Sequence, residues 1–317
     1  MMKKAVLGKK KSDLTIVIPV YNEQESLPGL LPDLISYCSK KNWKFIIVDD
    51  GSTDLTRKIL SKYTHHPLMR VISHKVNQGY GGALKTGIMN TKTPYVLTMD
   101  GDGQHNLEDI GKVFKFLLEK NADVVVGKRE GTFPGSWGRE IGKAIIRTIT
   151  RVLMPLPIHD LNSGFKCYRS ELAQIYAPLC PNSMAFSDII TLIFINQGDL
   201  VLEYPISIKP RLLGKSTIRI NTAFDTIMEI ISLVMMFNPQ KIFIPLSALC
   251  VIAGVVWEIP IFLQGRGVSV GSTLAIFSGL LFFSMGLLAS QLSAIRMESI
   301  SRYKKKDEED KIEINDC

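Results

Sequence analysis

The sequence contains few cysteines, and none of them is spaced for a metal or a disulfide framework. Five cysteines are scattered along 317 residues, an odd number without a Cys-x-x-Cys pair. This pattern excludes a disulfide scaffold and a zinc module, and it is typical of a reducing compartment. His65, His66, His74 and His159 also lack metal-ligand spacing.

Two common nucleotide-binding signatures are also absent. A Rossmann site needs Gly-x-Gly-x-x-Gly directly after the first strand, but Pro19-Val-Tyr-Asn-Glu23 stands there, and Leu84 replaces the third glycine in the stretch from Gly79 to Gly87. The sequence has no Walker A lysine loop. The 46% of hydrophobic residues excludes a disordered chain, and the length allows one large domain or two ordinary ones.

The apolar residues are concentrated near the C-terminus, in two runs. Ile244 to Phe262 has Glu258 as its only charge, and Val270 to Leu292 has none. A helix needs about 20 apolar residues to cross the hydrocarbon core, so the runs predict two transmembrane helices, about 242–262 and 270–292. The alternative is a buried helical pair in a soluble protein. Glu258 is expected to snorkel, to pair, or to face protein.

The distribution of basic residues predicts the orientation of this hairpin. The connecting loop carries only Arg266, whereas Lys241 and a cluster from Arg296 to Lys306 flank the outer ends. Both termini are therefore expected in the cytoplasm. The basic N-terminus, 1–12, lacks the apolar core of a signal peptide, so the large N-terminal region is expected there too.

Three further segments complete the predicted domain organisation. A soluble domain is expected over 13–219 and the membrane hairpin over 241–293. Between them, 220–240 shows apolar residues at helical spacing; this juxtamembrane amphipathic helix would lie in the membrane interface or pack on the soluble domain. The charged tail, 294–317, is expected to be solvated and disordered from Ser301 onward.

The soluble domain alternates apolar runs with helical segments. Continuous apolar runs of this kind predict buried strands of a mostly parallel sheet with helices on both faces, an α/β fold. A helix is expected after the first strand through about Ser39, and Asp50 to Asp54 supplies a turn and a helix N-cap. The expected strands are 14–19, 45–49, 69–73, 95–100 and 123–127.

Acidic residues follow three of these strands. Ligands bind at the carboxyl ends of strands in such sheets. Asp100-Gly-Asp102 is the densest of these groups, and two carboxylates separated by one small residue can converge on Mg²⁺ or Mn²⁺ that also binds substrate phosphates. The alternative is a solvated turn. His105 would be a ligand, or would contact phosphate or solvent.

Taken in order, these motifs resemble the family 2 glycosyltransferases of GT-A fold, and more narrowly the dolichyl- and polyprenyl-phosphate sugar synthases. The hairpin resembles the two-helix anchor of the bacterial bactoprenol glucosyltransferase branch. The resemblance covers about 13–217. It is carried by Ile18-Pro-Val-Tyr-Asn-Glu23, Val48-Asp-Asp-Gly-Ser-Thr-Asp54, Asn77-Gln-Gly79, Met99-Asp-Gly-Asp-Gly-Gln-His105, Val126-Gly-Lys-Arg129, Trp137-Gly-Arg139, Asp160-Leu-Asn-Ser-Gly-Phe165, Glu203-Tyr-Pro-Ile206 and Arg211-Leu-Leu-Gly-Lys-Ser-Thr217.

The resemblance implies a set of site residues. The metal and the donor pyrophosphate would be held by Asp100, Asp102 and Gln104, and the acceptor phosphate by Arg129, Arg139 and Ser163. The nucleotide-sugar donor would also meet Pro19, Tyr21, Glu23, Asp49, Asp50 and two residues of a closing loop, Arg211 and Ser216. The residues implied in catalysis are Asp102, Asp160 and Arg139.

Some positions depart from the family pattern or allow several roles. Thr217 stands where relatives often have lysine, with Lys215 two residues earlier, and Lys143 stands where a serine is often seen. Asp160 would orient Arg139 or the sugar, act as a base, or form a structural cap; orientation is favoured.

The chemistry expected from this resemblance is a membrane-anchored, inverting, metal-assisted transfer of one sugar from a nucleotide-diphosphate sugar to undecaprenyl or dolichyl phosphate. A phosphate monoester is mostly dianionic at pH 7 and needs no strong base. The other readings are a non-catalytic membrane scaffold and a processive polysaccharide synthase, which is disfavoured because the sequence has no Gln-x-x-Arg-Trp motif. A nucleic-acid partner for the +8 charge is not expected, and the resemblance allows a homo-oligomer.

Overall fold

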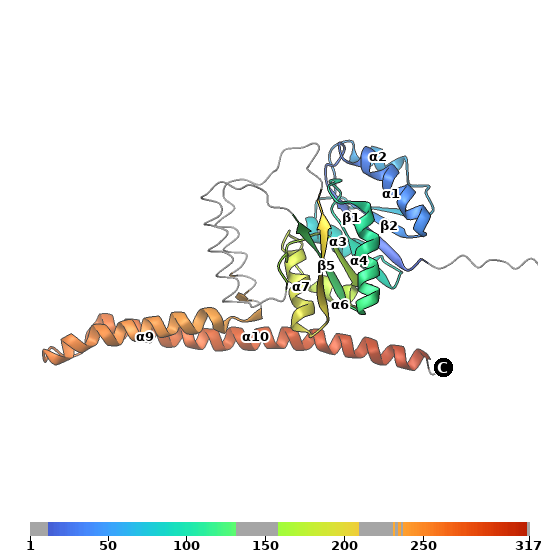
Figure 1. The fold of residues 1–317 in the computed structure, drawn as a ribbon. Coiled ribbons are helices and arrows are strands. Elements are labelled where there is room, and N and C mark those ends of the chain that lie inside the picture. Colours follow the sequence, from blue (N-terminus) through green and yellow to red (C-terminus); the bar gives the residue numbers. More distant parts are fainter. Residues whose placement is uncertain (1–11, 131–157, 209–230, 232–233, 236, 316–317) are drawn as a thin grey trace, which may run out of the picture. The chain divides into compact units, whose positions relative to one another are not determined.

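The computed structural model describes residues 12–130, 158–208, 231, 234–235 and 237–315. The chain divides into two compact units, one containing the α/β fold and one containing the C-terminal helices (Figure 1). Each unit is described by itself below.

A seven-stranded mixed sheet forms the centre of the first unit, in the order β3-β2-β1-β4-β6-β5-β7. Neighbouring strands are parallel except at β6, which is antiparallel to both β4 and β5. The strands are β1 (Leu14–Val20), β2 (Lys44–Asp49), β3 (Met69–Ser73), β4 (Tyr95–Thr98), β5 (Val124–Glu130), β6 (Lys166–Arg169) and β7 (Val201–Ser207).

Helices cover both faces of this sheet. On one face, alternate residues of β1 such as Ile16 and Ile18 pack in the main core with the buried residues of α1 and α4. On the other face α3 lies so close to β1 that a Cβ on Gly87 would stand 2.2 Å from Val17 Cγ1. The helices of this unit are α1 (Leu27–Lys41), α2 (Thr56–Ser61), α3 (Tyr80–Met89), α4 (Leu107–Lys120), α6 (Ser170–Tyr176), η1 (Ala177–Leu179) and α7 (Phe186–Asn196).

The sheet confirms the predicted α/β class and extends it. All five expected strands are present, and α1 begins at Leu27 and ends at Lys41, close to the expected end. The strands β6 and β7 were not predicted. At α2 the N-cap position is Leu55, which makes no side-chain cap, although Asp54 Oδ1 still accepts the Thr56 amide at 2.9 Å.

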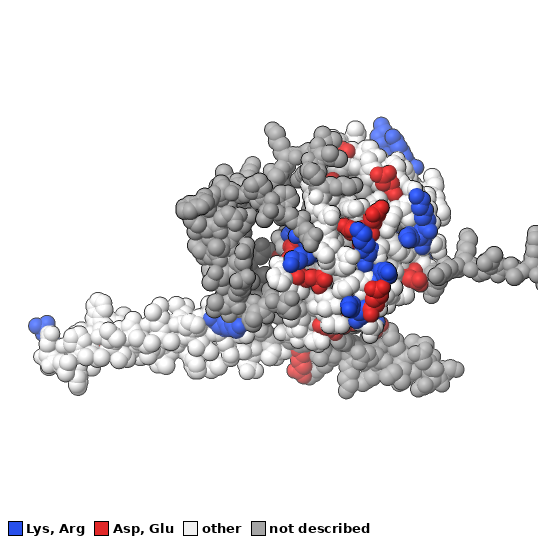
Figure 2. All heavy atoms as spheres, in the orientation of Figure 1, with Lys and Arg blue, Asp and Glu red and all other residues white. Residues whose placement is uncertain are grey.

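The second unit contains the predicted hairpin, α9 (Gln240–Leu263) followed by α10 (Val270–Asn315). Among the described residues two helical segments, Gln240–Leu263 and Val270–Arg296, are long and apolar enough to cross a membrane. Only 11% and 17% of their most apolar windows are buried, which argues against a pair of soluble core helices. Figure 2 shows the side chains of this hairpin almost without charge, in contrast to the mixed charges of the α/β unit.

Small residues bring α9 and α10 together. Ser247 donates its hydroxyl to the Gly279 carbonyl at 2.7 Å. A Cβ on Gly279 would stand 2.6 Å from Val251 Cγ2. Near the turn, Glu258 of α9 accepts the Ser269 amide at 3.1 Å and the Ser272 hydroxyl. Its carboxylate therefore pairs within the hairpin, at the start of α10, where negative charge favours a helix.

The charged tail differs from its expected disorder. The structure continues α10 as a helix through Asn315, so this expectation was wrong. The physical reason lies in the composition of this segment, which is rich in lysine and glutamate, and both residue types are good helix formers.

The close packing at Gly279 leads to a testable expectation. Gly279→Leu forces a side chain against Val251 and removes the geometry of the Ser247 bond, so we expect a destabilisation of about 1–3 kcal/mol, as for overpacked cores. Thermal unfolding of the full chain in detergent measures it. Gly271→Leu is the matched control, because only Ser269 Oγ, 3.6 Å away, lies near its added Cβ. Equal melting temperatures for the two variants would contradict the packing.

Candidate active site

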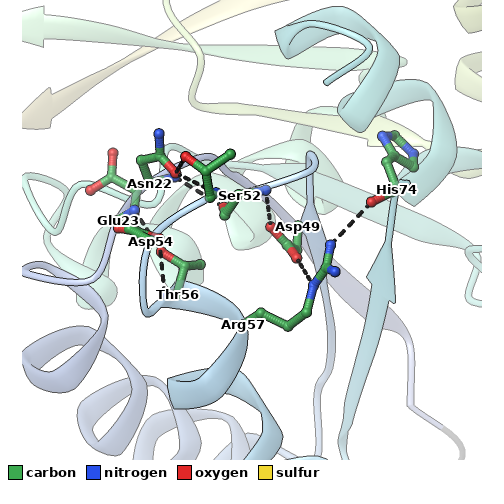
Figure 3. Close-up of polar contacts among 9 residues, drawn as sticks. Asn22, Glu23, Asp49, Ser52, Asp54, Thr56, Arg57 and His74 are labelled. Carbon is green, nitrogen blue, oxygen red and sulfur yellow. Dashed lines mark hydrogen bonds and ion pairs between the residues drawn. The ribbon is translucent and has the colours of Figure 1, made fainter. Parts of the chain in front are cut away.

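The loops after β1 and β2 are joined by side-chain caps (Figure 3). Asn22, in the left-handed region at φ 54°, accepts the Thr53 amide at 2.9 Å, while its own amide donates to Ser52 Oγ at 3.0 Å. The Glu23 amide donates to Thr56 Oγ1 at 2.9 Å. Asparagine tolerates this backbone region better than most residues. These hydrogen bonds therefore join the two loops into one rim at the carboxyl edge of the sheet.

Asp49, at the end of β2, is fully buried and satisfied within the protein. Its Oδ1 accepts the Ser52 amide and its Oδ2 accepts Arg57 Nε, both at 3.0 Å. Arg57 in turn donates to the His74 carbonyl at 3.2 Å (Figure 3). Asp49 therefore holds the loop after β2 and, through Arg57, connects it to the backbone just after β3.

Asp50 is also saturated by internal bonds. Its Oδ1 lies 2.7 Å from His74 Nδ1 and accepts the Gln78 amide at 2.9 Å, and its Oδ2 accepts the Gly79 amide at 2.9 Å. The other nitrogen of His74 lies 2.9 Å from Thr86 Oγ1 on α3. The carboxylate thus fixes the loop that leads into α3.

The remaining residues expected on the donor side differ in exposure. Pro19 is buried in β1, Tyr21 is 45% exposed, and Glu23 is half-buried and accepts the Ser26 hydroxyl. Tyr21 therefore offers the most accessible surface among them. Their contacts with a donor stay predictions, as do those of Asp49 and Asp50.

Asp100, just after β4, lies between two side chains. Tyr80 donates its hydroxyl to Oδ1 at 2.8 Å, and His105 Nε2 lies 3.6 Å from Oδ2. Burial raises the pKa of Asp100, but the contacts with His105 and Tyr80 outweigh it, so the pKa lies below its usual value. The carboxylate is ionised at neutral pH and is still partly open to solvent.

Asp102 lies on a tight turn two residues further on. Its Oδ1 accepts the Gln104 amide at 3.0 Å, and Gly103 between them has φ 74°, which favours glycine. Asp102 and Gln104 line a cavity of about 570 Å³ together with His105 and a face of α1. The turn therefore places the Asp102 carboxylate beside room for a ligand.

Gly164 joins this acidic segment to the loop before β6. A Cβ at Gly164 would stand 2.6 Å from the Tyr80 hydroxyl and 2.7 Å from Asp100 Oδ1. Thr98 Oγ1 donates to the Gly164 carbonyl at 2.8 Å. The close approach needs the absence of a side chain, so glycine sets the distance between the two segments.

Asp160 is paired with Arg129 at the end of β5. Arg129 Nε and Nη2 donate to the two carboxylate oxygens at 2.8 Å each, and the Arg129 amide adds a third bond at 3.1 Å. Burial raises the pKa of Asp160, but the bonds and charge of Arg129 outweigh it and leave the pKa lowered. Such a carboxylate is a weak base, which favours orientation of an arginine over proton abstraction.

Lys166 holds the loop that carries Asp160 through a bond to its backbone. It is fully buried on β6 and donates to the Leu161 carbonyl at 2.8 Å, to Thr191 Oγ1 at 2.7 Å and to the Ser187 carbonyl. Burial lowers the pKa of Lys166 to about 8. Ser163 is also fully buried, with its hydroxyl accepting the Phe165 amide at 3.3 Å.

Some expected site residues lie outside the described residues, namely Arg139, Lys143, Arg211, Lys215, Ser216 and Thr217. The structure also adds residues that sequence reasoning missed: Tyr80, His74, Lys166 and Glu203. The available signals were a lysine directly after Phe165 in a motif of the resemblance, and an acid within Glu203-Tyr-Pro-Ile206.

The sheet and its acidic edge define the GT-A class of nucleotide-sugar-binding folds. A crystal structure of glucosyl-3-phosphoglycerate synthase from Mycobacterium tuberculosis, in complex with Mn²⁺, UDP-glucose and phosphoglyceric acid, has a TM-score of 0.54. It is 19% identical, over 70% of this chain and 80% of that one, a likeness that establishes the fold alone.

The chain belongs to glycosyl transferase family 2, which matches residues 15–175, and residues 238–295 match the GtrB C-terminal hairpin. A dolichyl-phosphate beta-glucosyltransferase from Dictyostelium discoideum is 33% identical over 52% of this chain and 56% of its own length. An undecaprenyl-phosphate 4-deoxy-4-formamido-L-arabinose transferase from Photorhabdus laumondii is 26% identical over 89% of both chains. The chain spans about half the length of the Dictyostelium relative and of a dodecaprenyl-phosphate galacturonate synthase from Rhizobium johnstonii, which it covers to 48%.

Proposed function

We propose that the protein transfers one sugar from a nucleoside diphosphate sugar to the phosphate of a polyprenyl lipid, with inversion at the anomeric carbon. The observation that carries the proposal is the combination, in one chain, of an acidic GT-A strand edge with a two-helix apolar hairpin. Relatives named for dolichyl, dodecaprenyl and undecaprenyl phosphate support a lipid acceptor.

The two carboxylates at the strand edge fit a divalent cation. Among the described residues no group of three or more His, Cys, Asp or Glu could hold a metal ion by itself. Mg²⁺, however, is usually bound by one or two carboxylates and completes its shell with substrate phosphates and water. Asp100, Asp102 and Gln104 would hold Mg²⁺ or Mn²⁺ in this way. The ion, when bound, supplies charge neutralisation for a diphosphate leaving group.

The residues of the chain account for the rest of the transfer. An oxygen of the lipid phosphate, mostly dianionic at pH 7, forms the new bond to the anomeric carbon while the bond to the diphosphate breaks. No proton needs to move, which agrees with the weak basicity of Asp160. Arg129, held by Asp160, offers a second edge of its guanidinium to an anion.

The hairpin supports a position at the membrane surface. We propose that the α/β unit and both termini lie in the cytoplasm, because the basic residues Lys241 and Arg296 stand at the outer ends of the two spans and the loop between the spans carries only Arg266. Activated donors are then met on the same side as the acceptor phosphate.

A transfer assay tests this function. The full chain in detergent is incubated with radiolabelled nucleoside diphosphate sugars, undecaprenyl or dolichyl phosphate, and Mg²⁺ or Mn²⁺. We expect labelled lipid with at least one donor, and a selective rise in melting temperature with that donor. Absence of labelled lipid across the panel would favour a membrane scaffold without catalysis, the competing reading.

A further inference from the structure

Glu203 of β7 holds the loop that carries Asp160. Its Oε1 accepts the backbone amide of Asp160 at 2.9 Å and that of His159, and its Oε2 lies 2.9 Å from His159 Nδ1. The side chain is only 14% exposed. Three donors from two consecutive residues thus converge on one carboxylate, which fixes both the position and the direction of the loop backbone.

The position of Asp160 decides where the Arg129 guanidinium lies. Because Asp160 takes both Nε and Nη2 of Arg129 at 2.8 Å, a shift of its backbone moves the guanidinium with it. The pairing of β5 with β7 places Glu203 opposite Val126 and Ile206 opposite Arg129. Glu203 therefore acts from the neighbouring strand, through the loop, on a residue at the end of β5.

The rest of the loop has separate supports. Lys166 holds the Leu161 carbonyl and Thr98 holds the Gly164 carbonyl, both at 2.8 Å. Loss of the Glu203 bonds therefore leaves the loop attached at its other end. The expected consequence is a local displacement of Asp160 and Arg129 rather than unfolding.

We propose that Glu203 is a positioning residue for the acceptor phosphate, acting through the backbone at 159–160 and through Asp160 on Arg129. The inference rests on the proposed function, in which Arg129 meets that phosphate. A glutamine could keep both backbone amides on its carbonyl oxygen and turn its NH₂ group toward His159 Nδ1, whereas alanine removes every acceptor at this position. A misplacement of about 1 Å at such a site can cost about 10²-fold in rate.

Glu203→Ala in the full chain tests the inference. We expect the KM for polyprenyl phosphate to rise about tenfold or more, while the KM for the sugar donor stays within about twofold of the unaltered chain. Asp123→Ala is the matched control: this carboxylate also accepts a backbone amide, that of Leu200 at 2.8 Å, and pairs with Arg169 at 3.0 Å, but at the start of β5. It should leave both KM values unchanged.

A double variant separates positioning from general stability. If Glu203 acts through Arg129, then Glu203→Ala combined with Arg129→Ala raises the acceptor KM no further than Arg129→Ala alone. Additive effects, equal changes in both KM values, or unchanged kinetics in Glu203→Ala would overturn the inference.

A binding measurement keeps the inference independent of turnover. Undecaprenyl phosphate, compared with uncharged undecaprenol, should raise the melting temperature of the unaltered chain and of Asp123→Ala, and should raise that of Glu203→Ala much less. If this pattern appears without sugar transfer by any chain, the proposed function fails and the positioning role stands. If transfer occurs but Glu203→Ala binds the phosphate like the unaltered chain, the positioning role fails alone.

Discussion

Replacing Asp102 by alanine is expected to lower sugar transfer by about 10³-fold, the scale of losing a charge-stabilising group at a reacting centre. The carboxylate lies on the turn after β4 and lines the cavity beside it. The Asp102 side chain is half-buried, and it accepts a hydrogen bond from the Gln104 amide next to it in the chain. Because this contact is local, we expect the variant to keep the fold. Steady-state transfer to polyprenyl phosphate measures the loss.

The metal assignment has its own readout. Mn²⁺ titration followed by thermal unfolding, without lipid or donor turnover, should show a stabilisation that Asp102→Ala reduces. Asp13→Ala is the control, since Asp13 is an exposed acid just before β1, at the opposite end of the sheet. Full transfer activity of Asp102→Ala in a sample treated with chelator would contradict the proposed metal-binding role of this carboxylate.

Gly164→Ala is expected to lower the rate of sugar transfer by about 10²-fold. The added methyl group would stand 2.7 Å from Asp100 Oδ1 and 2.6 Å from the Tyr80 hydroxyl. Contacts below 3.0 Å oblige the acidic segment or the loop before β6 to move. Since the loop also carries Asp160, both the donor KM and the acceptor KM should rise. Kinetics with each substrate varied in turn measure the two effects.

Gly271→Ala is the matched change for this expectation. Only Ser269 Oγ, 3.6 Å away, lies within 4 Å of a Cβ at Gly271 on α10, and alanine is favoured over glycine in a helix by up to about 1 kcal/mol. This variant should keep transfer and melt at the same or a higher temperature. Gly164→Ala with unchanged KM values for both substrates would show that the close approach has no part in the chemistry.

The core of the fold could be predicted from the sequence because its strands are continuous apolar runs. Four of the expected strands, β1 to β4, lie side by side and pair in parallel, as the expected mostly parallel sheet requires. The antiparallel strand β6 was not predicted because it begins with Lys166, whose charge argues against a buried strand. Only the three-dimensional arrangement reveals that carbonyl and hydroxyl oxygens from the loop and α7 solvate its ammonium.

The candidate site could be located but not fully assigned. The strand-end rule placed Asp49, Asp50 and Asp100 at one edge, and the structure places all three there. The sequence could not show that Arg57 pairs with Asp49 and that His74 pairs with Asp50, since these partners come from α2 and from the segment after β3. Partners far apart in the chain leave no local pattern.

The contact at Gly164 also bears on how such enzymes could be redesigned. A loop taken from a relative to change the lipid acceptor would bring its own residue next to Asp100 and Tyr80. Because these groups lie so close together, the loop over 158–165 and the segment that carries Asp100 cannot be exchanged independently. A loop exchange that keeps the site would have to replace residues 158–165 together with Tyr80 and Asp100.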